Sequence, residues 1–373
     1  MKIKIGIVGS RGLSAVSGIK DSHDAEIAAI CDLDEDLLKR ESKRLGINKT
    51  FRVYEDMLNA DIDAVIVATP MQLHVQQTIQ ALIAGKHVLS EVTAGCSFDE
   101  LFWLVEEVEK SDKVYMMAEN YLYTPEVQQV LAMTKAGLFG EPYYGEGEYL
   151  HNLTHFTTYE DGTPNWRYWW QWGTRGLFYP THSLGPVMKW FGDDQIDFVV
   201  ALGSGCHTRP QFRQEDTSVA LLQMKSGKLI RLRLDCISRR PHAMHNYTLQ
   251  GTKGVYESPR VPGKHLVSFS EVDPVGIWGD QDWQDLSEFN EYLPERYRGG
   301  AGNEAGHGGG DYYIIRDFLD AVKGVKPPFI DVYEACEWTA VGLLSSLSVT
   351  NRGRAMDMPN FRSKSLKDHY VKL

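Results

Sequence analysis

The sequence lacks the features of several protein classes. None of its apolar runs reaches the length of about 18 residues that crosses a bilayer. Its start, MKIKIGIVGS, enters a strand pattern directly, without the charged segment and long apolar segment of a signal peptide. Basic residues are outnumbered, with 39 Lys and Arg against 50 Asp and Glu, and the formal net charge is −11. Because no excess of cations is available to neutralise phosphates, we expect neither nucleic acid nor membrane as a partner.

Cysteine is scarce as well. The chain has 5 Cys among 373 residues, widely scattered and never in a C-x-x-C pair. An odd number of dispersed cysteines does not favour a disulfide framework or a zinc ribbon, and it is typical of a reducing compartment. We therefore expect a cytoplasmic protein with no metal site.

Short apolar runs alternate with amphipathic stretches in the first third of the chain. The runs that read as buried strands are 3–8, 26–31, 63–68, 86–90 and 113–118. Helical patterns lie between them, for example over 34–46 and 71–85. Strand and helix repeated at this spacing predict an α/β Rossmann domain with a doubly wound parallel sheet, over residues 1–122.

The pattern changes after this point. Longer strand candidates without intervening helices occupy 142–152, 217–227, 228–238 and 245–258, and helices are predicted over 124–135, 311–323 and 332–351. The segment KSGK at 225–228 is typical of a hairpin turn. Residues 123–373 are therefore predicted to form an α+β domain with a large, mostly antiparallel sheet. Residues 271–310 lack periodicity, which indicates a functional loop or an oligomer arm.

The segment GIVGSRGLSA follows the first strand and opens the first helix. Gly9 and Gly12 allow a tight turn and a close backbone approach, and the helix start offers N–H groups to a pyrophosphate. Asp32 ends the second strand, where a carboxylate accepts ribose hydroxyls and repels a 2′-phosphate, so NAD is favoured over NADP. Two alternatives stay open: Arg11 could pair with a 2′-phosphate, and Asp32 could only cap a helix.

Further cofactor contacts are expected where later strands end. Pro70 makes the chain leave its strand sharply, so that the backbone of Ala68 and Thr69 lines the cofactor. Asn120 is expected at the nicotinamide ribose, and Arg167 is a candidate clamp for the pyrophosphate or the substrate. The complete predicted cofactor-binding set is Gly9, Ser10, Arg11, Gly12, Asp32, Ala68, Thr69, Pro70, His74, Glu91, Asn120, Trp166 and Arg167.

The segment YPTHSLGP places His182 between Pro180 and Pro186. We predict a stiff turn, with Pro180 fixing one backbone angle and Gly185-Pro186 anchoring the other side. An unperturbed histidine has a pKa of about 6.5. This value suits a base that takes a hydroxyl proton while hydride leaves the same carbon. Tyr179, three residues earlier, could hold or relay that hydroxyl.

The motifs ATP…H at 68–74 and GKHVL-E at 85–91 resemble the superfamily of glucose–fructose oxidoreductase, inositol dehydrogenase and MocA. The resemblance implies a sugar or polyol bound between a Rossmann domain and a sheet domain. It also implies a homodimer or homotetramer, because such sheets stack face to face between subunits. Two polar residues usual in the superfamily are missing. Val92 follows Glu91 where a lysine is common, and Phe178 stands four residues before His182 where an aspartate is common.

Within the superfamily, the chain is similar to the NAD-dependent α-N-acetylgalactosaminidases. The matching segments are ENYLY (119–123), EGEYLHNL (146–153), NWR (165–167), YPTHSLGP (179–186), QGTKG (250–254), GHGGGDY (306–312) and DVYEACEW (331–338). By this resemblance Glu119 and Tyr149 occupy active-site positions, and one of them or His307 would be a second base. His242 stands where that branch has a tyrosine, in an RPYS-like turn.

Several of these residues can also be explained without a functional role. Tyr149 could be an outward strand residue, and His307 could sit in a merely flexible glycine loop. His151 and His155 could suggest a metal pair, but no third ligand is near in the sequence. The tryptophans at 166, 169, 170 and 172 could be core residues or could stack on sugar rings and nicotinamide.

Three functions are compatible with the sequence. The first is an NAD-dependent sugar or polyol dehydrogenase. The second is an NAD-dependent glycosidase that works by oxidation at C3, elimination, hydration and re-reduction. The third is a non-catalytic NAD-binding sensor. We predict an oxidoreductase that moves hydride from a ring carbinol carbon to nicotinamide, since the first two functions share this step. The predicted catalytic set is His182, Tyr179, Glu119, Tyr149 and His307.

Overall fold

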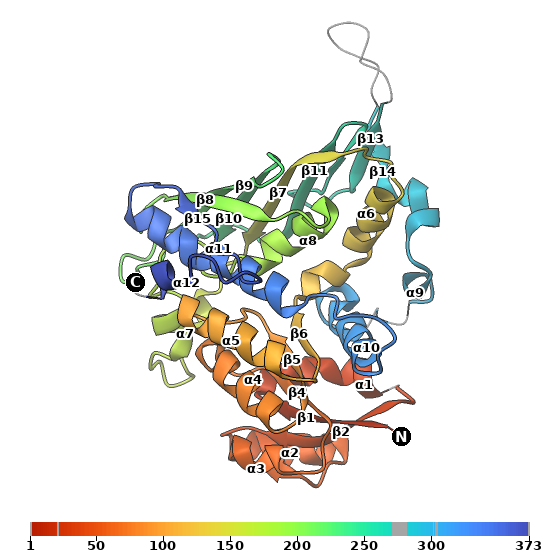
Figure 1. Cartoon of the computed structure of the whole chain (residues 1–373), viewed down its shortest axis with the longest axis vertical. Helices are drawn as coiled ribbons and strands as arrows, with labels where there is room; N and C mark the ends of the chain where they lie inside the picture. Colours follow the sequence, from red (N-terminus) through yellow and green to blue (C-terminus); the bar gives the residue numbers. More distant parts are fainter. Residues whose placement is uncertain (1, 21, 271–281, 301, 303–304, 372–373) are drawn as a thin grey trace, which may run out of the picture. The chain divides into compact units, whose positions relative to one another are not determined.

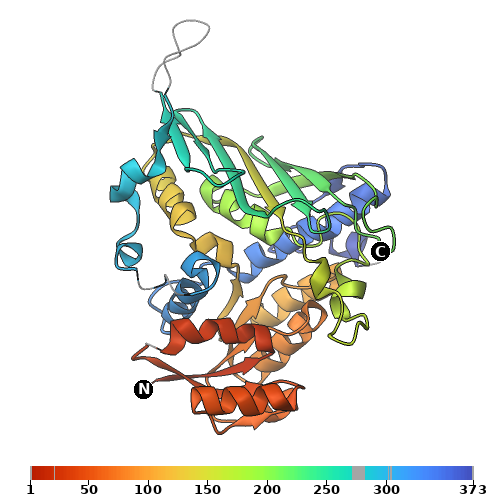
Figure 2. The ribbon, with the colours of Figure 1, turned by 180° about the vertical axis from the view of Figure 1, so that it is seen from behind.

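The computed structural model describes residues 2–20, 22–270, 282–300, 302 and 305–371, and Figures 1 and 2 show it from opposite sides. Its contacts divide the chain into two compact units. The first holds Met1–Tyr123, Ala301–Ala340 and Pro359–Leu373, and the second holds Thr124–Gly300 and Val341–Met358. The sequence predicted one domain boundary, after residue 122. In the structure, residues 301–340 and 359–373 also belong to the first unit.

The sheet of the first unit has six parallel strands in the order β3-β2-β1-β4-β5-β6. Their bounds are β1 Ile3–Val8, β2 Ala25–Cys31, β3 Thr50–Phe51, β4 Ala64–Val67, β5 His87–Glu91 and β6 Tyr115–Ala118. The predicted doubly wound parallel sheet is confirmed. The strand order reverses between β1 and β4, and in such sheets ligands bind beyond the carboxyl ends of the strands at that point.

Helices cover this sheet, and their ends follow local sequence signals. The described helices are η1 Ser10–Ala15, α1 Val16–Lys20, α2 Glu35–Leu45, α3 Tyr54–Leu58, η2 Met71–Leu73, α4 His74–Ile83, α5 Phe98–Lys110, η3 Asn120–Tyr123, η6 His307–Gly309, α10 Gly310–Val322 and α12 Lys367–Tyr370. Asp34 caps α2 by accepting from two backbone N–H groups, and Gly46 ends it in the left-handed conformation. Helix α10 lies against α1, as Figure 1 shows, because Gly18 leaves room for Ile315.

The second unit is built on a nine-stranded sheet in the order β14-β13-β12-β11-β7-β10-β9-β8-β15. The strands are β7 Pro142–Leu150, β8 Ile196–Gly203, β9 Ser218–Met224, β10 Leu229–Asp235, β11 Ala243–Gly251, β12 Gly254–Glu257, β13 Leu266–Phe269, β14 Gln284–Asp285 and β15 Met356–Asp357. Among the described strands of this second sheet, only the pairing of β10 with β7 is parallel. The predicted large, mostly antiparallel sheet is confirmed, but the single strand predicted over 245–258 is wrong. The chain reverses between β11 and β12, where Thr252 and Lys253 form the turn.

Helices of the second unit are α6 Pro125–Lys135, η4 Thr154–Phe156, α7 Trp166–Trp170, α8 Thr181–Phe191, η5 Leu286–Tyr292 and α9 Glu295–Arg298, and α11 Val332–Thr350 belongs to both units. Residues 271–281, 301, 303 and 304 of the predicted loop lie outside the described residues. The described remainder contains η5 and α9, so the expectation of an irregular segment is wrong there. In the ranges that the structure describes, no helix is long and apolar enough to cross a membrane.

Helix α8 lies directly on one face of the sheet, as Figure 1 shows. A β-carbon on Gly147 of β7 would stand 1.9 Å from the carbonyl oxygen of Ser183 in α8. On β10, Ile230 pairs with Gly145 and Leu232 with Gly147, and both apolar side chains are completely buried. The resemblance implied that sheets of this kind stack face to face between subunits. The face that carries these side chains is instead covered by the unit's own helix α8.

The close approach at Gly147 gives a first test. Gly147→Ala is expected to destabilise the protein by about 1–3 kcal/mol or more, because the added methyl would force β7 and α8 apart. Thermal unfolding followed by circular dichroism measures the effect. Gly299→Ala is the matched control, since a β-carbon there meets nothing within 4 Å and its φ is −85°. Equal melting temperatures for the two variants would contradict this account of the helix–sheet contact.

Candidate functional site

The loop after β1 is pressed against the end of β4. Gly9 has φ of +89°, and a β-carbon on it would stand 2.4 Å from the carbonyl oxygen of Ala68. A β-carbon on Gly12 would stand 2.7 Å from Cγ2 of Ile7. Only glycine fits at these two positions, so the backbone of Ser10 and the start of η1 lie at the strand-order reversal. This is the arrangement in which helix N–H groups bind a dinucleotide pyrophosphate.

Asp32 lies at the carboxyl end of β2, beside this loop. One of its oxygens accepts a hydrogen bond from the backbone N of Asp34 at 3.0 Å, and the side chain stays partly exposed. The guanidinium of Arg11 lies 3.8 Å from Glu91 and 3.9 Å from Asp311. Arg11 is therefore held by two carboxylates, which weakens the alternative that it recruits a 2′-phosphate. Asp34, not Asp32, caps α2, which removes the cap explanation for Asp32.

Asp311 is a site residue that the sequence reasoning missed. It lies in the first turn of α10 and is buried, with Nδ1 of His307 at 3.1 Å and a hydrogen bond from Asn120. Burial alone would raise the pKa of Asp311, but His307, Arg11 and Asn120 together hold it below its usual value. The signal was present in GHGGGDY, because His307 and Asp311 are four residues apart. His307 has φ of +54° and is oriented by this carboxylate.

Asn120 carries a buried acceptor. Its amide donates to Asp311, while its Oδ1 is buried and has no hydrogen-bond partner among the described residues. A buried carbonyl oxygen of this kind needs a donor, and a ribose hydroxyl of a nicotinamide nucleotide would supply one. With the glycine loop and Asp32, this acceptor fits a bound dinucleotide.

His74 contacts the loops that follow β4 and β5. Its ring is 1% exposed, and its two nitrogens lie 2.8 Å from the carbonyl oxygens of Thr69 and Thr93. A neutral ring donates to only one of these carbonyls, and burial lowers the pKa of His74 although both contacts favour the charged form. His74 thus supports the loop of Ala68, Thr69 and Pro70 through the carbonyl of Thr69, and the cofactor contact predicted for His74 stays a prediction.

Glu119 also lies in the first unit, at the carboxyl end of β6. It is completely buried, and its Oε1 accepts from the backbone N of Tyr121 at 3.2 Å. The ring of Tyr121 stands edge-on to His307, with centroids 5.9 Å apart. The first unit thus brings together Arg11, Glu91, Glu119, Asn120, His307 and Asp311, from segments far apart in the chain.

The predicted base His182 belongs to the second unit, in the first turn of α8. It is 5% exposed, and its ring centroid lies 4.7 Å from that of Tyr179 and 5.0 Å from that of Tyr149. Tyr149 is likewise 5% exposed and comes from β7, so it faces the helix and is not an outward strand residue. Three groups able to hold or move protons therefore lie together, with His182 and Tyr149 buried and Tyr179 partly exposed, and we call them the His182 cluster.

The stiff turn predicted around His182 is wrong, because Thr181–Phe191 is a helix with Pro186 inside it. Leu184, Val187 and Phe191 recur at helical spacing and are buried. A proline at 186 has no N–H for the carbonyl of His182, four residues earlier. The hydroxyl of Tyr247, on β11, donates to this carbonyl instead, at 2.6 Å. The proline inside the helix is thus tolerated, and His182 gains an anchor on the sheet.

Trp166 and Arg167 lie in the second unit too, in α7. The guanidinium of Arg167 lies over the Trp166 ring, 4.3 Å from its centroid, and Asn165 caps the helix. Trp172 is completely buried and is a core residue, whereas Trp169 and Trp170 are 64% and 45% exposed. Because the first unit carries the dinucleotide loop, the cofactor role predicted for Trp166 and Arg167 stays a prediction.

Family comparisons match both parts of the chain. Residues 3–119 match the oxidoreductase family with an NAD-binding Rossmann fold. Residues 123–211 and 198–368 match the C-terminal domain of glycosyl hydrolase 109. A glycosyl hydrolase family 109 protein of Shewanella pealeana is 30% identical over 95% of this chain and 84% of that protein. An alpha-N-acetylgalactosaminidase of Shewanella oneidensis is 30% identical over 95% of this chain and 83% of that enzyme.

Solved structures show the same fold at lower identity. A levoglucosan dehydrogenase in complex with NADH has a TM-score of 0.78 and 17% identity, covering 96% of this chain and all of that one. An apo scyllo-inositol dehydrogenase from Lactobacillus casei has a TM-score of 0.72 and 20% identity, covering 95% of this chain and 98% of that one. At such identities the likeness concerns the fold.

The position of Asp32 predicts cofactor selectivity. Asp32→Ala is expected to weaken NAD binding by about 1.5–3 kcal/mol, the size of hydrogen bonds to a charged group. Isothermal titration calorimetry with NAD and with NADP measures it. Asp36→Ala is the control, because that carboxylate is 92% exposed on α2. If native protein binds NADP as tightly as NAD, the role assigned to Asp32 is wrong.

Proposed function

Because this chain belongs to glycosyl hydrolase family 109 and carries the NAD-binding Rossmann fold of the oxidoreductase family, we propose that it is a redox-neutral, NAD-dependent glycosidase. The observation that carries the proposal is the His182 cluster. A plain dehydrogenase needs one base for the hydroxyl proton, whereas oxidation followed by elimination needs a second base for a carbon-bound proton. His182 and Tyr149, with ring centroids 5.0 Å apart, provide two.

His182 would take the proton from the C3 hydroxyl of the sugar ring. Bound NAD supplies the acceptor for the C3 hydride and returns the hydride at the end of the cycle. Tyr179, edge-on to His182, would hold the same hydroxyl and limit its rotation. Because Tyr247 fixes the carbonyl of His182, the imidazole needs little reorientation between steps.

The C3 ketone acidifies the proton on C2, and Tyr149 is our candidate for the base that removes it. The electron pair of the C2–H bond becomes the C1=C2 bond as the C1–oxygen bond breaks. Water then adds at C1, C2 regains a proton, and reduction of C3 restores the hydroxyl through His182. Glu119 and His307, in the first unit, remain candidates for contacts to the nicotinamide ribose or to the leaving group.

The substrate class follows from the relatives. One relative carries the name alpha-N-acetylgalactosaminidase, so 4-nitrophenyl N-acetyl-α-galactosaminide is the first compound to test in a panel of aryl glycosides. The competing function is a carbohydrate dehydrogenase, which would produce reduced cofactor in step with an oxidised sugar. A non-catalytic NAD sensor would do neither.

His182→Ala is expected to lower turnover of the aryl glycoside by about 10²–10⁴-fold, the contribution of a positioned acid–base group. NAD affinity should stay native, because His182 lies outside the Rossmann unit. His155→Ala is the control, an exposed histidine of the same unit.

Native protein in deuterated water should release sugar with deuterium at C2. Net accumulation of reduced cofactor without C2 deuterium would identify a dehydrogenase instead.

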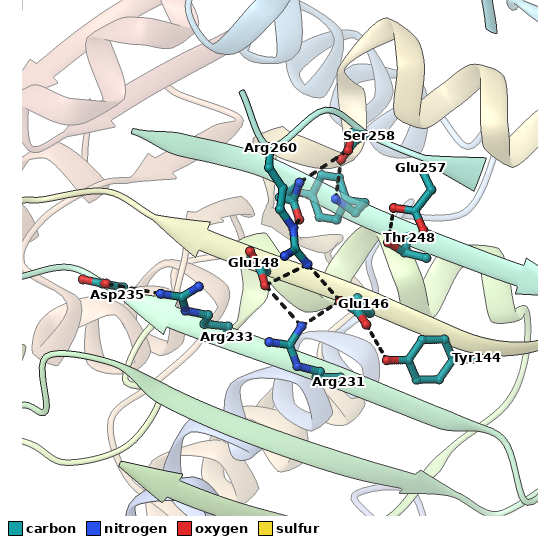
Figure 3. Close-up of polar contacts among 12 residues, drawn as sticks. Tyr144, Glu146, Glu148, Arg231, Arg233, Asp235, Thr248, Glu257, Ser258 and Arg260 are labelled. Atoms are coloured by element: carbon teal, nitrogen blue, oxygen red, sulfur yellow. Dashed lines mark hydrogen bonds and ion pairs between the residues drawn. The ribbon is translucent and has the colours of Figure 1, made fainter. Parts of the chain in front are cut away.

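We also propose that the second unit pairs with another copy through the face of the sheet opposite α8. Figure 3 shows this face: Nη1 of Arg231 lies 2.7 Å from Glu146 and 3.2 Å from Glu148, and Arg260 reaches both carboxylates. Glu148 is only 1% exposed. Next to Arg231 in register is Leu221, which is 44% exposed and paired with Val200.

Neutralised charges beside an exposed leucine favour a self-complementary partner over a highly charged one. Leu221→Lys is therefore expected to convert a dimer or tetramer into smaller species, because two lysines would repel each other across a symmetric contact. Light scattering coupled to size-exclusion chromatography measures the mass. Ile83→Lys is the control, a 75% exposed position on α4. A native monomer at micromolar concentration would refute the proposal.

A further inference from the structure

Three side chains of the second unit form a line from the His182 cluster to solvent. The phenol oxygen of Tyr149 lies 3.0 Å from Nδ1 of His151, and the His151 ring stands edge-on to His242 with centroids 4.4 Å apart. Tyr149 is 5% exposed, His151 is half-buried and His242 is exposed. The line therefore connects a buried side chain with an exposed one.

Strand pairing places these residues together. Leu150 of β7 pairs with Ala243 of β11 in an antiparallel ladder. His151 follows Leu150 and His242 precedes Ala243, so the two histidines come opposite each other where the pairing ends. The backbone N of His151 also donates to the carbonyl of Asp235 at 2.9 Å, which fixes it to β10. Two neighbouring strands thus determine the position of His151, which is not that of a mobile surface histidine.

We propose that Tyr149, His151 and His242 form a proton path between the buried active site and solvent, with His151 as the group that receives the Tyr149 proton. The proposal rests on the proposed glycosidase function and adds to it the residues that carry the C2 proton away. It assigns a role to His151, which touches Tyr149 and not the sugar, and so makes it a positioning and proton-transferring residue.

The proton transfers balance without any further reactant. In the resting state the Tyr149 phenol donates to the unprotonated Nδ1 of His151, which carries its own proton on Nε2. As the phenol proton moves to Nδ1, the phenolate oxygen takes the proton from C2, and the C2–H electron pair forms the C1=C2 bond while the C1 substituent leaves. His151, now doubly protonated, releases its Nε2 proton toward His242 and water. Reversal of these transfers returns a solvent proton to C2 after water has added at C1.

A metal role does not explain the histidines. The ring of His155 packs on Phe156 with centroids 3.9 Å apart, and in the described part of the chain no group of three His, Cys, Asp or Glu side chains could hold a metal ion. A purely structural role would require only that His151 accept the Tyr149 hydrogen bond. The two roles differ in whether His151 takes up a proton. A structural acceptor need not be protonated, whereas a proton path requires it.

His151→Asn separates these roles. The asparagine oxygen can accept from Tyr149 but cannot be protonated, so fold and NAD affinity should stay native. Turnover of 4-nitrophenyl N-acetyl-α-galactosaminide, or of the panel glycoside that native protein hydrolyses fastest, is expected to fall at least about 10²-fold. In deuterated water, the sugar released by this variant should carry less C2 deuterium per turnover than the native product, because the proton taken from C2 cannot leave Tyr149 and returns.

His242→Phe tests the outer end of the path. Phenylalanine keeps an edge-on ring beside His151 but has no nitrogen, so the C2 deuterium fraction should again fall, and imidazole in the buffer should restore it. His155→Phe changes a histidine of η4 outside the line and should behave as native. Native C2 deuterium and turnover in both His151→Asn and His242→Phe would overturn the path while leaving the glycosidase proposal intact. Native protein that hydrolyses no glycoside of the panel would overturn both.

Discussion

The position of His182 depends on one hydrogen bond across the second unit. Pro186 cannot donate to the carbonyl of His182, and the Tyr247 hydroxyl takes that place at 2.6 Å. The first turn of α8 is thereby tied to β11, while Gly147 lets the next residue, Ser183, approach β7 without a side chain between them. Helix and sheet meet closely enough for a strand tyrosine, Tyr149, to lie beside a helix histidine. The cluster thus follows from a proline and a glycine that would each weaken a regular element elsewhere.

The first unit shows how a parallel sheet gathers distant residues. Glu91 and Glu119 end two adjacent strands, and Arg11 follows a third, so their side chains emerge at the same edge. The chain then returns with α10 to place Asp311 there as well. Gly310 permits this, because a β-carbon on it would stand 2.5 Å from the carbonyl oxygen of Asn120. Asp311 holds His307 and Asn120 at once, and a buried carboxylate with this many donors resists rearrangement.

The sequence was informative where periodicity was strong and local. Runs such as IKIGIV became strands with nearly the predicted bounds, because a strand buried on both faces is continuously apolar. It misled around Pro186, since glycine and proline in succession usually mark a turn, and the hydroxyl that makes a helix possible comes from residue 247, distant in sequence. Asp311 and His151 were missed for a similar reason. The spacing within GHGGGDY pairs Asp311 with His307, but tertiary contacts bring Arg11 and Asn120 to Asp311 and His242 to His151, and the local sequence does not show these partners.

Burial also explains why the second base needs a partner. A lone phenolate in the interior of the second unit would carry a large desolvation cost. When the Tyr149 proton moves to Nδ1 of His151, 3.0 Å away, the pair exchanges one neutral arrangement for a phenolate beside an imidazolium, and its net charge stays zero. Attraction at this distance offsets part of the desolvation. His242 then offers an exposed site at which the excess proton is hydrated. A base buried without such a neighbour could hold a hydroxyl, but it would have no low-energy way to take a proton from carbon.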